Sequence, residues 1–252
     1  MVYEPRPGAA PRPRMLVGQA ALETRLLLRN GEQLLLTIII PTFLLVVLTA
    51  VPIVDIDNGR RIDFLTPGVL ALAVMSTAFT GQAIATGYER RYGVLKWLGA
   101  TPLPRWILLG GKIASVLLVE ALQVTVLCVV AYALGWHPHG SPLAVAVLLV
   151  LGTGAFAGLG LLMAGTLRAE TTLAAANLVW VLLLVGGGVI VPIDRFPDAV
   201  QPVLKALPIT ALSDGLRDVL QHGAGFPWAS VGILAAWAAV ACTAAALTFR
   251  WD

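Results

Sequence analysis

Six runs of apolar residues follow one another along the chain, separated by short polar stretches. A helix needs about 20 apolar residues to cross the hydrocarbon core of a bilayer, and each run reaches or exceeds this length. The pattern therefore predicts an all-α membrane protein with six transmembrane helices. The predicted spans are, approximately, 33–54, 64–87, 106–135, 142–167, 171–191 and 227–249.

The chain before the first span changes from proline-rich to amphipathic. Residues 1–14 are rich in proline and arginine and have little apolar surface to bury, so we expect a disordered cytoplasmic tail. Over residues 15–31 apolar positions recur at helical spacing, while Arg25 and Arg29 share the opposite face. Glu23 lies on the apolar side of this pattern. The segment is predicted to be a helix that lies in the membrane interface.

A polar, proline-broken stretch, 192–225, separates the last two spans. Apolar residues on either side of Pro208 recur at helical spacing, which predicts an outer hairpin of two short amphipathic helices. The simplest interpretation is an outer loop that rests on the membrane surface. Three glycines, Gly186–Gly188, precede this stretch and weaken the fifth span, so we expect a hinge or an unwound helix end there.

Glycines also recur along the fourth span, where Gly154 and Gly158 form a G-x-x-x-G pattern. Small residues at this spacing allow two helices in a membrane to approach closely. The pattern favours close packing of the fourth span, either within the chain or across a dimer.

The composition agrees with a protein that spans the membrane several times. Apolar residues make up 58% of the chain and charged residues 12%, whereas a soluble domain carries about 25% charged residues. The net charge of +3 would suggest nucleic-acid binding in a soluble protein, but here the distribution of the charges explains it. A cytoplasmic N-terminus places 12 of the 17 Lys and Arg residues on the inner side, so both termini are predicted to be cytoplasmic. The abundance of Arg, Ala and Gly is compatible with a GC-rich bacterial genome, so we expect a bacterial plasma membrane. No nucleic-acid partner is expected.

A charged amphipathic segment, 88–101, lies between the second and third spans. Tyr88 and Leu95 fall at helical spacing on one side, and the charged residues project elsewhere. Pro102 follows the segment and ends the predicted helix, because proline lacks an amide donor and clashes with the preceding turn.

This segment resembles the first cytoplasmic loop of the type-2 ABC exporter permeases, in particular the daunorubicin-resistance type. The family pattern is close to E-R-x-x-G-x-L-K-x-L-x-A-T-P-L. The outer hairpin resembles the same family at the matching position, through the sequence pattern FP...Q...LP.T...DGLR. The residues that match are Glu89, Arg90, Gly93, Leu95, Lys96, Leu98, Ala100, Thr101, Pro102 and Leu103 in the first pattern, and Phe196, Pro197, Gln201, Leu207, Pro208, Thr210, Asp214, Gly215, Leu216 and Arg217 in the second.

The resemblance implies the membrane permease of an ATP-driven exporter of amphipathic drugs, lipids or glycoconjugates. In that family two permease chains, identical or related, form the pathway and work with two copies of a separate P-loop ATPase. The chain contains no G-x-x-x-x-G-K-[ST] pattern, so ATP and Mg²⁺ are expected to bind the partner, and this chain is expected to hold no cofactor and not to be an enzyme.

The resemblance assigns residues 88–101 to contact with the ATPase, and we name them the coupling segment. Its charged side chains offer charge-assisted hydrogen bonds to a partner. The alternative is that these charges only set the membrane topology and bind anionic lipid headgroups. The residues assigned to coupling are Tyr88, Glu89, Arg90, Arg91, Gly93, Lys96 and Pro102.

Three polar residues within the spans are candidates for the transport pathway: Glu120, Gln123 and Asn177. An ionisable group at bilayer depth is costly and usually faces a protein interior or a wet pathway. Glu120 therefore either contacts a cationic or polar substrate, or acts as a proton-linked switch, or pins adjacent helices by a hydrogen bond. Amides such as Gln123 and Asn177 can equally serve as hydrogen-bonding links between helices.

Two other functions compete with an exporter permease. An ion-coupled secondary transporter would call for more intramembrane charge than Glu120 supplies, and for an inverted repeat. An integral membrane enzyme would need several carboxylates or a nucleophile and base at one depth, and no span supplies them. Neither alternative explains the coupling segment.

Overall fold

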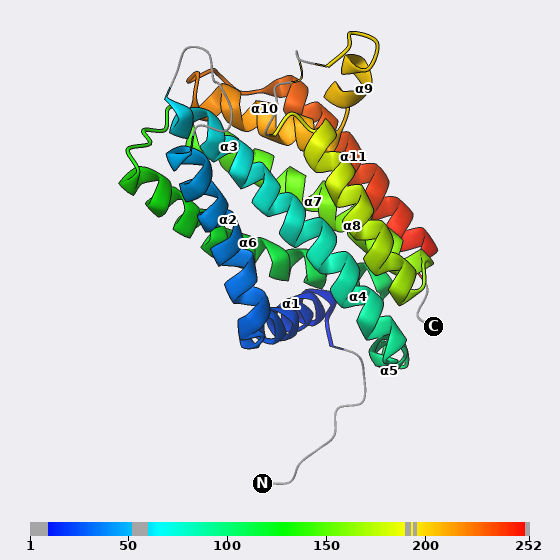
Figure 1. Cartoon of the computed structure of the whole chain (residues 1–252). Coiled ribbons are helices and arrows are strands. Elements are labelled where there is room, and N and C mark those ends of the chain that lie inside the picture. Colours follow the sequence, from blue (N-terminus) through cyan, green and yellow to red (C-terminus); the bar gives the residue numbers. More distant parts are fainter. Residues whose placement is uncertain (1–9, 52–59, 190–192, 194–195, 250–252) are drawn as a thin grey trace.

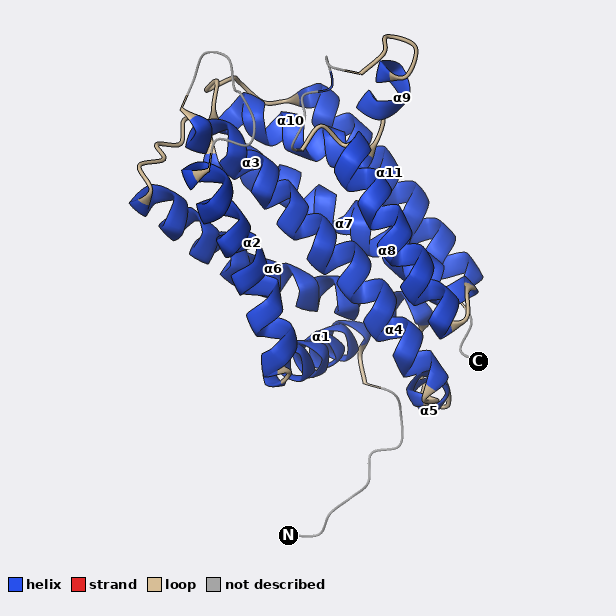
Figure 2. Cartoon of the chain, viewed as in Figure 1, coloured by secondary structure: helices blue, strands red, loops and turns tan. Residues whose placement is uncertain are grey.

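The computed structural model describes residues 10–51, 60–189, 193 and 196–249. These residues form helices joined by short loops, without a strand among them (Figure 2). A π-helical stretch, η1 (Met75–Gly81), joins two of the helices into one continuous rod. The helices are α1 (Arg12–Arg29), α2 (Gly31–Ala50), α3 (Arg61–Val74), α4 (Gln82–Arg91), α5 (Val94–Gly99), α6 (Arg105–Ala133), α7 (Pro142–Thr166), α8 (Ala169–Gly186), α9 (Gln201–Lys205), α10 (Pro208–Leu220) and α11 (Trp228–Thr248).

Within the described residues, five helical stretches are long and apolar enough to cross a membrane: α3–η1–α4 as one unit, α6, α7, α8 and α11. They lie where the second to sixth spans were predicted. The apolar part of α2, Thr37–Ala50, is shorter than these five, and the last residues of the predicted first span, 52–54, lie outside the described residues. Figure 1 shows the long helices bundled together, with α1 and α5 at one end and α9 and α10 at the other.

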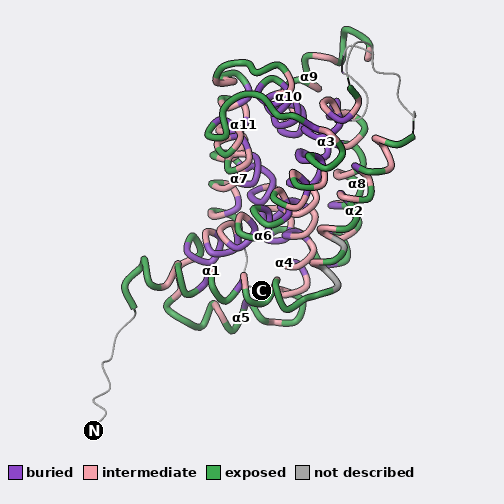
Figure 3. The backbone as a smooth tube through the Cα atoms, turned by 90° about the vertical axis from the view of Figure 1, so that its left-hand side faces the viewer, coloured by how far each residue is buried: buried purple, intermediate pink, exposed green. Residues whose placement is uncertain are grey.

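The bundle is built around α3, which is buried at every residue from Leu65 to Val74 (Figure 3). Such a helix is apolar all round because it has neighbours on all sides. The outer helices instead expose large apolar side chains, for example Phe43, Val129 and Val240. Exposed apolar surface along long helices is typical of helices that contact lipid tails.

Several helix boundaries differ from the predicted ones by a few residues, and two of these differences have a local cause. The first helix begins at Arg12 rather than at residue 15, because the prolines of this stretch lie before or within the first helical turn, where no backbone donor is needed. Residues 1–9 of the predicted tail lie outside the described residues. The fifth span ends at Gly186 rather than at residue 191, and Gly188 has a φ of 65°. The predicted unwound end at the three glycines is therefore confirmed.

The glycines of α7 pack within the chain. A Cβ at Gly158 would lie 2.9 Å from Cβ of Ala241 in α11, and one at Gly160 would lie 2.6 Å from the carbonyl oxygen of Phe79 in η1. The fourth span thus meets two neighbours at backbone distance. The G-x-x-x-G pattern was predicted to pack either within the chain or across a dimer. The contact of Gly158 is of the first kind, within the chain.

The outer hairpin does not rest on the surface as a loop. Its second helix, α10, begins at Pro208 and packs against α3, α7 and α11, so that most of its residues are buried. The backbone N–H of His139, before α7, donates to the carbonyl of Leu220 at 3.0 Å. This helix closes one end of the bundle.

Candidate functional site

The coupling segment is two helices and not the single helix predicted for 88–101. α4 ends at Arg91, and α5 begins at Val94. Between them Gly93 has a φ of 76°, in the left-handed region that favours glycine. The N–H of Gly93 donates to the carbonyl of Arg90 at 3.0 Å, so the turn closes α4 while α5 leaves in a new direction. The break between α4 and α5 therefore requires a glycine at position 93.

Three consecutive charged residues at the end of α4 each contact a different helix. Glu89 forms an ion pair with Lys112 of α6, with 2.7 Å between Oε2 and Nζ. Arg90 donates from Nη1 to the carbonyl of Ala164 at 2.8 Å, in the last turn of α7, where carbonyls lack helical partners. Successive helical residues point 100° apart, which allows one turn to reach several neighbours.

Arg91 completes this set through an ion pair with Glu170 in the first turn of α8, at 2.6 Å between Nη1 and Oε1. Both side chains are at least half exposed, so this pair is worth little energy. Of the predicted coupling residues, Glu89, Arg90 and Arg91 are thus engaged within the chain. They brace the end of α4 against α6, α7 and α8.

The rest of the coupling segment presents an exposed surface. Tyr92 and Trp97 are 73% and 80% exposed, and Lys96 and Pro102 are also exposed. Tyr88 stacks on Tyr92 with 6.1 Å between the ring centres. Leu95 is fully buried and holds α5 against α6 and the chain after α11, through Leu108 and Phe249. One side of the short helix α5 is therefore buried against the bundle, and its other side is exposed to solvent.

Lys112 was not among the residues singled out from the sequence, yet it is the most deeply buried charge at this end. Its side chain is 1% exposed, and it contacts both Glu89 and Glu23. Glu23 also accepts a hydrogen bond from Gln19 at 2.8 Å. We name these four residues the Lys112 cluster. The signals in the sequence were a lysine inside an apolar run and Glu23 on the apolar side of its helix.

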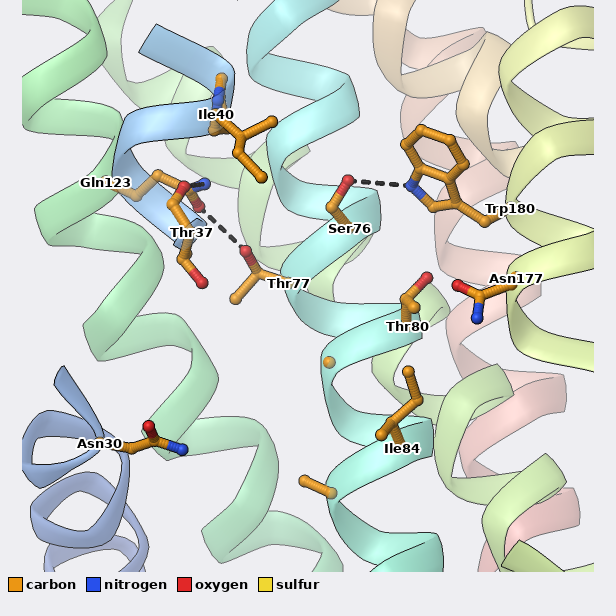
Figure 4. Close-up of a pocket in the computed structure, with 13 residues that line it drawn as sticks. Asn30, Thr37, Ile40, Ser76, Thr77, Thr80, Ile84, Gln123, Asn177 and Trp180 are labelled. Atoms are coloured by element: carbon orange, nitrogen blue, oxygen red, sulfur yellow. Dashed lines mark hydrogen bonds between the residues drawn. The ribbon is translucent and has the colours of Figure 1, made fainter. Parts of the chain in front are cut away.

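A half-open cavity of about 680 Å³ lies between α2, η1, α4, α6 and α8. Gln123 and Asn177, two of the three predicted pathway residues, line it together with Ser76, Thr80 and Trp180. Figure 4 shows these side chains around the space, with Asn177 and Thr80 close to one another. The indole N–H of Trp180 donates to Oγ of Ser76 at 2.9 Å, which fixes the ring. Among the described side chains that line the cavity, none is charged.

Gln123 also has a structural task. It donates from Nε2 to the carbonyl of Thr37 at 2.7 Å and accepts from Oγ1 of Thr77 at 3.2 Å (Figure 4). Thr37 lies four residues before Pro41, which has no N–H to offer that carbonyl. Gln123 supplies the missing donor.

Glu120, the third predicted pathway residue, does not line this cavity. It is 3% exposed and hydrogen-bonded through Oε2 to the hydroxyl of Thr153 in α7. Its Oε1 has no hydrogen-bond partner among the described residues. The contact joins α6 to α7, which matches the helix-pinning alternative for this residue.

The outer-hairpin residues lie at the opposite end from the coupling segment (Figure 1). Arg217 of α10 donates from Nη2 to the carbonyl of Val189 at 2.9 Å, and its guanidinium lies 4.1 Å from the ring centre of Phe64. Burial lowers the pKa of Arg217, and Asp214, 3.3 Å away, opposes this shift by stabilising the charge. Arg217 thereby ties α10 to α3.

The other predicted hairpin residues shape the turn before α10. The carbonyl of Phe196 accepts a hydrogen bond from Nε2 of Gln201 at 2.9 Å. Pro197 is exposed, and Pro208 occupies the first helical position of α10, where its missing N–H costs nothing.

Comparison with known proteins identifies the family. The family model of the ABC-2 type transporters matches residues 20–220. The protein named "Putative transport permease YvfS" of Bacillus subtilis (strain 168) is 23% identical over 232 residues, which cover 88% of this chain and 92% of that protein. The ABC transporter G family member 20 of Dictyostelium discoideum is 26% identical over 179 residues, 70% of this chain but 24% of that longer protein. The chain belongs to the ABC-2 type transporter family, whose members are non-enzymatic membrane subunits of ABC transporters and normally pair with an ATPase subunit.

Proposed function

We propose that this chain is the permease of an ATP-driven exporter in a bacterial plasma membrane, with α2 as the first of six spans and both termini in the cytoplasm. Two permease chains, identical or related, form the pathway, and two copies of a separate ATPase drive it. The observation that carries this proposal is the coupling segment, which is exposed on α5 and braced at the end of α4 against α6, α7 and α8.

The geometry suggests how a push on this segment reaches the membrane. The ATPase contacts the exposed side of α5, where Tyr92, Lys96 and Trp97 are accessible. A displacement of α4 is passed to α6 by Glu89, to α7 by Arg90 and to α8 by Arg91. Since α4 continues through η1 into α3, the same displacement also reaches the central helix.

The cavity is the proposed entrance to the pathway. Its hydroxyl and amide groups suit the hydrogen-bonding part of an amphipathic drug, lipid or glycoconjugate. A second permease chain would cover the open side. The competing ion-coupled mechanism depends on Glu120, which lies away from this cavity.

The first experiment is affinity purification of the chain from native membranes in mild detergent, followed by an ATPase assay. We expect a P-loop ATPase to co-purify. Replacing Glu89 or Arg90 by alanine should uncouple ATP hydrolysis from transport and leave membrane insertion intact, because each variant removes one brace of α4.

The matched control is Arg60→Ala, which removes an exposed arginine that pairs with Asp63 at the other end of α3. It should behave as the wild type. A clean, monomeric chain without an ATPase, or full coupling in both the Glu89 and Arg90 variants, would contradict the proposed function.

A further inference from the structure

The Lys112 cluster places one buried cation between two carboxylates from distant parts of the chain. The Nζ atom of Lys112 lies 2.7 and 2.9 Å from the two oxygens of Glu89, and 3.0 and 3.1 Å from those of Glu23. Glu89 belongs to the coupling segment, and Glu23 to α1. One ammonium group therefore holds the N-terminal helix and the end of α4 at the same time.

α1 faces the bundle with its polar residues. Gln19 and Glu23 are its buried residues, whereas Val17 and Leu26 are more than half exposed. A helix held only by lipid would bury its apolar side in the membrane and leave its carboxylate in water. Here the carboxylate is directed inward, and Gln19 donates to it at 2.8 Å, which fixes its orientation.

The surface of α6 is shaped to receive this helix. A Cβ at Gly111 would lie 2.5 Å from Cγ of Gln19 and 3.2 Å from the backbone N of Ala20, and one at Gly110 would lie 3.2 Å from Leu16. The glycines before Lys112 thus let α1 approach to backbone distance. This approach brings Glu23 within reach of Nζ.

The energetics make the three charges act together. Taking a charge out of water is costly, and a buried charge that loses its partner retains that cost. Pulling Glu23 or Glu89 away from Lys112 would remove two of the four oxygen contacts of Nζ and leave the other carboxylate as its partner. Each carboxylate therefore supplies part of the compensation of the buried ammonium group, which favours the arrangement that keeps α1, α4 and α6 together.

We propose that Lys112 is a positioning residue that fastens α1 to the coupling segment, so that α1 moves with the end of α4. That the ATPase causes this movement rests on the proposed function. The attachment itself is a property of this chain and is open to test without an ATPase.

The attachment is tested by pulsed electron resonance on the full chain in lipid nanodiscs. Spin labels are placed at Leu22→Cys in α1 and Tyr92→Cys after α4, both exposed positions, with Cys128 and Cys242 replaced by alanine. The wild type should give one narrow distance distribution. Glu23→Ala should broaden it several-fold, and Glu23→Gln, which keeps the shape and loses the charge, should broaden it less.

The control is Asp218→Ala, which removes an exposed carboxylate that lies 3.6 Å from Nδ1 of His222, at the end of the bundle away from α1 and α5. It should leave the distribution between α1 and α4 unchanged. If Glu23→Ala does not fold, the distance distribution of Glu23→Gln alone tests the attachment of α1. An unchanged distribution in the folded Glu23 variants means that packing alone holds α1, and this result overturns the proposal.

A second measurement separates this inference from the proposed function. Hydrogen exchange is compared with and without ATP in the complex of the unlabelled chain with its co-purified ATPase. In the wild type, α1 and residues 88–99 should change together, and in Glu23→Ala residues 88–99 should still change while α1 does not. An equal response of α1 in both proteins overturns the fastening. No response of residues 88–99 in the wild type contradicts the proposed function, while the spin-label result still decides the attachment.

Discussion

At the scale of single residues, Gln123 acts where the backbone of another helix lacks a donor. Pro41 offers no N–H to the carbonyl of Thr37, and Nε2 of Gln123 takes its place at 2.7 Å. The same amide accepts a hydrogen bond from Thr77. One side chain therefore links α2, η1 and α6, and its place beside the cavity follows from this backbone requirement.

We expect Gln123→Leu to lower the free energy of unfolding by about 0.6–2 kcal/mol, the worth of a hydrogen bond between membrane helices. In a Pro41→Ala background the cost should be smaller, because the restored N–H at position 41 satisfies Thr37. Denaturant unfolding in mixed micelles measures both values. Asn177→Leu, which removes an exposed amide from the same cavity, is the control, and equal costs in the two backgrounds would contradict the pairing.

At the scale of helices, close approach depends on the absence of a side chain at a few positions. Gly111 is one of them, because α1 lies directly over it. At Gly232 in α11, by contrast, an added Cβ would have no described atom within 4 Å. The two glycines allow the packing of α1 on α6 to be tested against a matched substitution.

Gly111→Leu should push α1 away from α6 at a cost of about 1–3 kcal/mol, as overpacking does. The exposed Arg25 and Arg29 of α1 should then be cut faster by trypsin, because a detached helix opens more often. Gly232→Leu should leave the rate of cleavage unchanged. Identical cleavage of the two variants would show that α1 does not depend on this contact.

At the scale of the whole molecule, the cavity is bordered by surfaces of α2 and α8 that no described part of the chain covers. The proposed second permease chain would close this side. Val181 of α8 lies next to the cavity residue Trp180 and is 48% exposed, whereas Val240 of α11 is 66% exposed on another helix.

A cysteine at Val181 should therefore be cross-linked between copies by a bifunctional maleimide in membranes, in a chain without its native cysteines. Val240→Cys serves as the control and should remain monomeric. Cross-linking of Val240→Cys alone would place the contact between copies on α11 instead.

Most of the helical architecture could be predicted from the sequence, because the length and hydropathy of each run reflect the bilayer. The contacts that single side chains make could not be predicted in this way. Glu89 was predicted as a contact for another protein, but whether it meets Lys112 depends on how α4 and α6 pack, which hydropathy does not encode. The break at Gly93 was missed for a related reason, since a helical spacing continues across it on both sides.

The glycine contacts between α7 and α11 also have a consequence for how the protein is made. α11 follows α7 in the chain only after α8, α9 and α10, so α7 enters the membrane long before the helix that fits against Gly154 and Gly158 is synthesised. Until then this surface of α7 has no partner from α11. A nascent chain that stops before Trp228 would present it uncovered, together with the side of α10 that α11 covers. An unfinished chain therefore exposes glycine-lined backbone that the finished chain buries.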